Sequence, residues 1–185
     1  MAKIVTVFTG KNLEWMTKEG GSGYWIAQGH RITSAPYLLC IRNHRETWAV
    51  KDDGVQHGQA FLIARGIGCK KSTEHKGRKV ITFKEYAELP RDNASFKKAW
   101  KTLTDGQRYP VSYLELTDIF NKLQIDPEAL DWKPFNAISE SKLPLNQDQE
   151  VDDEKDLAEI ITEAKEMVAN AAGVDISKVM IQVAF

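Results

Sequence analysis

The chain has few of the residues that usually mark a metal-binding or redox protein. Its 185 residues include only two cysteines and four histidines. There is no CxxC pair, and the histidines do not have the spacing of metal ligands. Cys40 and Cys69 lie in or beside apolar runs, where a free cysteine usually packs as a small hydrophobe. We therefore expect neither a metal nor another cofactor.

The local motifs of common enzyme classes are also missing. There is no GxSxG or SxxK motif, and neither cysteine has a neighbouring histidine. The stretch Gly20-Gly21-Ser22-Gly23 lacks the spacing of a phosphate-binding loop and predicts a flexible turn instead. Glu163-Ala164-Lys165 has the tripeptide of some nucleases, but it falls in a predicted helix. A binding protein is thus expected more than an enzyme, and no catalytic residue is assigned.

Long apolar runs are missing as well. None approaches the roughly 20 residues that a membrane-spanning helix needs, and the start, Met1-Ala2-Lys3-Ile4, lacks the apolar core of a signal peptide. We expect a cytoplasmic protein without a membrane partner. The length fits one ordinary domain with a short appendage.

What the chain does have is a strong charge asymmetry behind a net charge of −1. Residues 1–113 carry 19 Lys and Arg against 10 Asp and Glu, a balance of +9, and the remaining residues balance at −10. A basic body of this size attracts polyanions, because neutralising phosphates releases condensed counterions. Aromatic residues lie between the basic clusters and can stack on unpaired bases, which favours a nucleic-acid partner.

The apolar runs predict the organisation of the first 135 residues. Strands are expected at 3–8, 37–41, 60–64 and 79–83, with short helices at 94–103 and 116–123 and one that Asn12 caps. These strands are joined by turns and short helices rather than long crossover helices. The pattern favours an α+β fold built on a small mixed β-barrel, residues 1–135.

The rest of the chain predicts an appendage. Residues 136–152 are polar and aperiodic, as in a linker. Residues 153–185 predict a helix–strand element, an amphipathic helix ended by Gly173 and a strand over 179–185. Such an element needs a surface to dock on, and the strand at 3–8 is one candidate edge. A homodimer through this element is the other arrangement that the sequence allows.

The stretch from Tyr37 to Phe135 resembles the PUA-like superfamily, which includes the EVE, YTH and ASCH domains. The resemblance rests on a buried strand, Tyr37–Ile41, followed by a polar loop with Trp48. His57-Gly58 then leads into the apolar strand Ala60–Ala64 and its glycines, and Val80-Ile81-Thr82-Phe83 precedes Pro110-Val111-Ser112-Tyr113. The whole sequence also resembles uncharacterised bacterial proteins that pair such a domain with a terminal helix–strand element.

The resemblance implies a PUA-like barrel that binds RNA or DNA by capturing a flipped or modified base in an aromatic pocket. Trp48 is then the expected stacking residue, and Tyr109 and Tyr113 are expected at the same mouth. Donors to the base or the phosphates are expected from four basic residues and one amide: Arg42, Asn43, Arg45, Lys70 and Lys71.

Two other functions stay open. One is an ASCH-like hydrolase acting on a modified nucleoside or on RNA, with Lys84-Glu85, Lys70, Lys71 or Glu46 as candidate groups. The other is a protein-interaction or regulatory module that docks through its helix–strand element by strand addition. Turnover of a modified nucleoside would favour the hydrolase. Binding to a protein rather than to nucleic acid would favour the interaction module.

Overall fold

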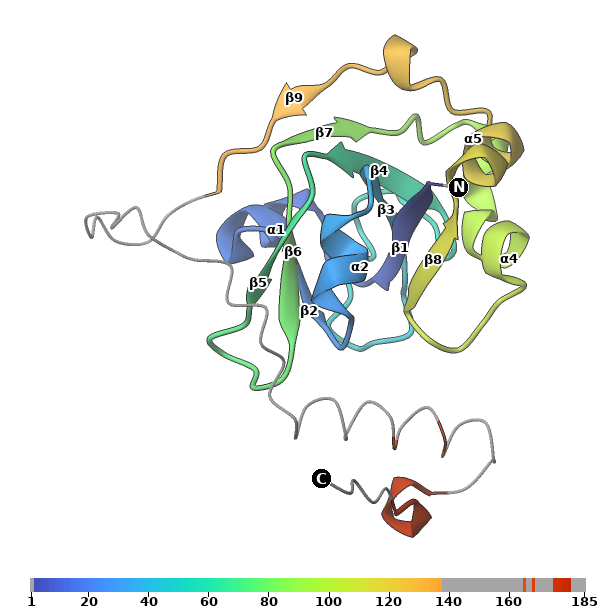
Figure 1. Cartoon of the computed structure of the whole chain (residues 1–185). Coiled ribbons are helices and arrows are strands. Elements are labelled where there is room, and N and C mark those ends of the chain that lie inside the picture. Colours follow the sequence, from blue (N-terminus) through green and yellow to red (C-terminus); the bar gives the residue numbers. More distant parts are fainter. Residues whose placement is uncertain (1, 138–164, 166–167, 169–174, 181–185) are drawn as a thin grey trace, which may run out of the picture. The chain divides into compact units, whose positions relative to one another are not determined.

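The computed structural model describes residues 2–137, 165, 168 and 175–180 (Figure 1). Contacts divide the chain into two compact units, Met1–Ser141 and Lys142–Phe185. The boundary falls inside the stretch 136–152 that the sequence predicts as a linker. The first unit has an α+β fold and holds every strand discussed below.

The larger sheet of this unit has six strands in the order β8-β1-β3-β4-β7-β9. β1 and β3 are parallel, and the other neighbouring pairs are antiparallel. The strands are β1 (Lys3–Thr9), β3 (Tyr37–Arg42), β4 (Ala60–Arg65), β7 (Glu85–Glu88), β8 (Val111–Glu115) and β9 (Lys133–Pro134).

Both faces of this sheet are buried, which explains why its central strands are apolar without alternation. In β1, Ile4 and Phe8 join one apolar cluster while Val5 and Val7 join the other. The alternation continues in β3, where successive side chains enter opposite clusters. The sheet is therefore the middle layer of this unit.

Different elements cover the two faces. One face packs against α3 (Ala94–Lys97), α4 (Ala99–Thr104) and α5 (Leu116–Leu123). The other packs against α1 (Leu13–Glu19), α2 (Gly29–Thr33) and a three-stranded sheet of order β2-β6-β5. That sheet comprises β2 (Ser22–Trp25), β5 (Gly68–Lys71) and β6 (Lys79–Thr82). Two short 3-10 helices, Pro127–Ala129 and Ile176–Lys178, complete the elements discussed here.

The structure confirms the four strands and the helix start predicted from the apolar runs. β1, β3, β4 and β6 lie within one residue of the expected limits. The Asn12 side chain caps α1 by accepting a hydrogen bond from the Trp15 N–H, at 3.1 Å.

Three predictions about local structure are wrong. The stretch from Gly20 to Gly23 is not a loose turn, because Ser22–Trp25 forms β2 and a side chain at Gly21 would collide with the Ile81 carbonyl. The helix expected over 94–103 is broken at Lys98 into α3 and α4. The predicted strand at 3–8 has no open edge, since β1 lies between β3 and β8.

The sequence predicts a closed barrel, but the strand pairing within residues 2–137 does not close one. Within residues 2–137 no ladder joins β8 to β9, so the six-stranded sheet is open between these two strands (Figure 1). The predicted helix and strand over 153–185 lie almost wholly outside the described residues. In the described part of the chain, no helix is long and apolar enough to cross a membrane.

Candidate functional site

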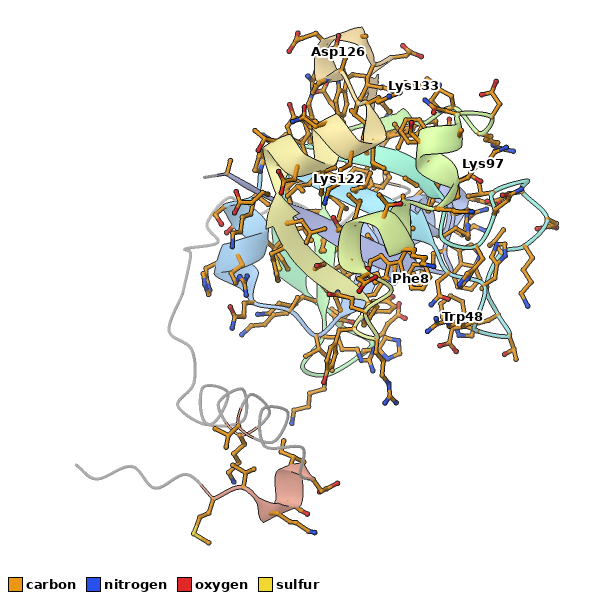
Figure 2. The ribbon with its side chains drawn as sticks, turned by 90° about the vertical axis from the view of Figure 1, so that its right-hand side faces the viewer. Phe8, Trp48, Lys97, Lys122, Asp126 and Lys133 are labelled. Atoms are coloured by element: carbon orange, nitrogen blue, oxygen red, sulfur yellow. The ribbon has the colours of Figure 1, made fainter. Side chains whose placement is uncertain are left out.

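A pocket of about 560 Å³ opens beside the C-terminal end of β1. Its lining comes from β1, α1, β2, the loop after β3, the β5–β6 hairpin and the turn before β8. Figure 2 shows Phe8 and Trp48 on the same side of the body, far from Asp126 and Lys133. The residues are Phe8, Thr9, Gly10, Lys11, Trp15, Glu19, Gly23, Tyr24, Trp25, Asn43, Glu46, Trp48, Glu74, His75, Arg78 and Pro110.

Aromatic rings dominate one wall of the pocket. Trp15 and Trp48 have ring centroids 6.2 Å apart, and they are 41% and 50% exposed. Tyr24 also lines the pocket, with its ring 4.4 Å from that of His75, and the next residue, Trp25, is a buried part of the lining. Two exposed tryptophans side by side are unusual on a protein surface, and their free faces can stack on a planar heterocycle.

A charged pair lies within the same pocket. The Lys11 ammonium is 2.5 Å from Glu19 Oε1, and the two side chains are only 8% and 13% exposed. The same ammonium lies 4.3 Å from the centroid of the Tyr24 ring and 5.8 Å from that of Trp15. Rings and a carboxylate together stabilise this buried cation.

The tip of the β5–β6 hairpin forms the lip of the pocket. Arg78 donates a hydrogen bond to the Tyr24 carbonyl at 3.2 Å, and the His75 ring packs on the Tyr24 ring. Burial, a hydrogen bond to Glu74 and the negative charges of Glu19 and Glu74 raise the pKa of Tyr24 to about 12. Its phenol is therefore neutral at physiological pH.

The same hairpin carries a basic surface away from the lip. Lys70 and Lys71 lie on β5, the edge strand of the smaller sheet, and both are exposed. They do not line the pocket, but they share the hairpin with the pocket residue Arg78. The hairpin therefore carries cations both in the pocket lining, at Arg78, and on its outer strand, at Lys70 and Lys71.

Arg42, which the sequence suggests as a donor to nucleic acid, is instead fully buried at the end of β3. Its guanidinium donates to the Gly10 carbonyl at 3.0 Å and to Asp53 at 2.5 Å, and it lies over the Phe61 ring. Burial lowers the pKa of Arg42, and Asp53 opposes that shift. Arg42 therefore ties the loop after β3 to the turn after β1.

The remaining candidates divide between the pocket and other surfaces. Trp48 and Asn43 line the pocket. Arg45 lies just outside it, exposed, with its guanidinium 6.0 Å from the Phe8 ring. Tyr109 is exposed beside the pocket residue Pro110. Tyr113 is not at this mouth, because it lines a separate cavity of about 220 Å³ and stacks with Arg31 at 3.9 Å.

Sequence reasoning missed most of the polar residues in the pocket. Lys11 lies just before α1 and Glu19 is its last residue, and neither stands in a recognisable pattern. Tyr24 follows the glycines that looked like a loose turn, and His75 lies in a hairpin that looked only basic. Trp15 was missed as well, because it falls in the short helix that Asn12 caps, and the one signal that the sequence offered was Trp48 in its polar loop.

Comparisons with known proteins add no assignment to this geometry. The chain matched no protein-family model, no curated protein and no solved structure. In the part of the chain that the structure describes, no group of three or more His, Cys, Asp and Glu side chains is placed to hold a metal ion.

Proposed function

We propose that this protein binds single-stranded RNA or DNA and holds one unpaired or modified base in the aromatic pocket. The observation that carries the proposal is the pair Trp15 and Trp48, exposed side by side on a pocket of about 560 Å³. Base–aromatic stacking contributes about 1–3 kcal/mol per base, enough to hold an extruded base. We also propose that the chain is related to the PUA-like superfamily, that its sheets form a barrel of that type, and that the protein is cytoplasmic.

The distribution of charge supports the same partner. The pocket opens within the half of the chain that has a balance of +9, and the hairpin at its lip carries Lys70, Lys71 and Arg78. Phosphate contacts position a strand, whereas contacts in the pocket select the base. Binding should therefore depend on salt through the hairpin and on base identity through the pocket.

A titration of the full chain with labelled oligonucleotides tests the proposal. Affinity should fall steeply with salt, and Trp48→Ala and Trp15→Ala should each weaken binding about tenfold or more. Ile26→Ala is the matched control, because Ile26 is 65% exposed but outside the pocket lining. No binding to any RNA or DNA at low salt, modified or not, would refute the proposal.

A hydrolase is the second candidate, and the Lys11–Glu19 pair is the observation that favours it. A buried lysine beside a carboxylate in a pocket is a combination used for nucleophilic and acid–base catalysis. Of the groups suggested by the sequence for this role, Glu46 lines the pocket, whereas Lys70, Lys71, Lys84 and Glu85 do not. Release of acid from an acylated nucleoside, followed by chromatography and lost in Lys11→Ala, would establish this activity.

A further inference from the structure

The pocket is acidic although it lies in the basic half of the chain. Its lining includes two basic residues, Lys11 and Arg78, and three acidic ones, Glu19, Glu46 and Glu74. Residues 1–113 as a whole have a balance of +9. The place where a base would enter is therefore one where negative charge exceeds positive charge, in contrast to the hairpin beside it.

The pocket already accommodates one cation of its own. The Lys11 ammonium lies over the Tyr24 ring and against Glu19, with its side chain more than nine-tenths buried. The second oxygen of that carboxylate, Glu19 Oε2, is buried and has no hydrogen-bond partner among the described residues. Lys11 is therefore the partner of Glu19, and the remaining charged residues of the lining are two carboxylates, Glu46 and Glu74, and one guanidinium, Arg78.

The electrostatics of Tyr24 agree with an excess of negative charge. After burial and its hydrogen bond to Glu74, the charges of Glu19 and Glu74 also hold the pKa of the Tyr24 phenol near 12. Of these causes only the negative charges of Glu19 and Glu74 favour a cation beside the ring, because burial disfavours a charge of either sign. Aromatic faces beside carboxylates are the usual environment for cations that carry no strong hydration shell.

From this arrangement we propose that the pocket selects bases that carry a positive charge at neutral pH, such as 1-methyladenine or 3-methylcytosine, over their neutral counterparts. The inference rests on the proposed function. The cationic ring would stack on Trp48 or Trp15 with Glu46 and Glu74 nearby, while the phosphates of its strand stay on the hairpin lysines. Methylation at a ring nitrogen would then be recognised by its charge as well as by its bulk.

Pairs of isomers separate charge from size. 1-Methyladenine and N6-methyladenine contain the same atoms, but the first is a cation at neutral pH and the second is neutral. The full chain would be titrated with two seven-nucleotide strands that differ only in this central base, and tryptophan fluorescence would report binding. We expect the cationic strand to bind about tenfold more tightly. The preference should disappear when the pH is raised until 1-methyladenine loses its charge.

Substitutions then locate the preference. Glu46→Gln and Glu74→Gln keep the shape of the side chains and should each reduce the ratio of the two affinities, while Glu128→Gln, an exposed change outside the pocket, should leave it unchanged. Equal binding of the two isomers, or tighter binding of N6-methyladenine, would overturn the inference and leave the proposed function standing. No binding of either strand, or of any other oligonucleotide, would overturn both.

Discussion

The Lys11 ammonium and the Glu19 carboxylate meet at 2.5 Å across α1, one residue coming before the cap of the helix and the other from its last turn. Both side chains are almost enclosed, so each charge depends on the other for its stability. The pair also holds α1 against the end of β1, the strand that precedes it. Because both residues line the candidate site, a change that breaks the pair should affect the stability of the protein and the shape of the site together.

Removing one partner of this pair should destabilise the protein strongly. We expect Glu19→Gln to lower the free energy of unfolding by about 3 kcal/mol, because it leaves the Lys11 charge buried without a counterion. Urea denaturation followed by circular dichroism would measure the change. The matched control is Glu14→Gln, since Glu14 and Lys18 form an exposed pair on the same helix, worth less than about 0.5 kcal/mol. Equal losses from the two variants would contradict the buried geometry.

The buried position of Arg42 gives a second prediction, opposite to the one from sequence. Arg42→Ala should lower the free energy of unfolding by about 3–5 kcal/mol, because Asp53 loses its ion-pair partner and the Gly10 carbonyl loses a donor. Arg45→Ala removes an exposed cation from the neighbouring loop and should change stability by no more than about 0.5 kcal/mol.

Thermal denaturation and oligonucleotide binding would both be measured for these two variants. A stable Arg42→Ala protein that had lost only its affinity for nucleic acid would restore the sequence-based role of Arg42 as a direct donor.

The core strands could be predicted from sequence because each is a short continuous apolar run. β3 and β4 are buried on both faces, so nearly every position in these strands holds an apolar residue. No comparable sequence pattern indicates whether the sheet closes into a barrel. Whether β8 pairs with β9 is decided by long-range geometry, and the two residues of β9 carry too little pattern to indicate it.

The pocket was only partly predictable for a related reason. Trp48 could be found because a tryptophan in a polar loop has no packing role visible in the sequence. Lys11, Tyr24 and His75 come from three separate segments and meet only because the β5–β6 hairpin packs beside β2. Arg42 looked like its basic neighbours in sequence, although its side chain turns inward to Asp53.

Gly10 provides a steric prediction for the position of the Trp48 loop. A Cβ at Gly10 would lie 2.8 Å from the Ala49 Cβ and 2.9 Å from Trp48 Cζ3, so Gly10→Ala forces the loop to move. We expect a loss of about 1–2 kcal/mol in stability and quenching of tryptophan fluorescence by acrylamide that differs from wild type. Gly29→Ala is the control, because its added methyl would meet only Lys79 Nζ, at 3.5 Å. Unchanged stability and quenching in Gly10→Ala would show that the loop packs differently.

The two cysteines should differ sharply in their reactivity toward thiol reagents. Cys40 lies in the central strand β3, and burial raises its pKa to about 12. Cys69 lies on the edge strand β5 and is only half buried. Burial raises the pKa of Cys69 too, but the positive charge of Lys79 opposes this shift. Only the thiolate reacts, and its fraction grows as the pH approaches the pKa. Between pH 8 and 10 the labelling of Cys69 should therefore accelerate, while Cys40 stays unlabelled until denaturant is added.

Time-resolved labelling with a disulfide reagent, mapped by mass spectrometry, distinguishes the two sites. In Cys69→Ser the native protein should release no chromophore over the time in which wild type releases one equivalent. If Cys40 reacted as fast as Cys69, β3 would have to be accessible to solvent. The two-sided burial of the six-stranded sheet, on which the placement of the pocket depends, would then be wrong.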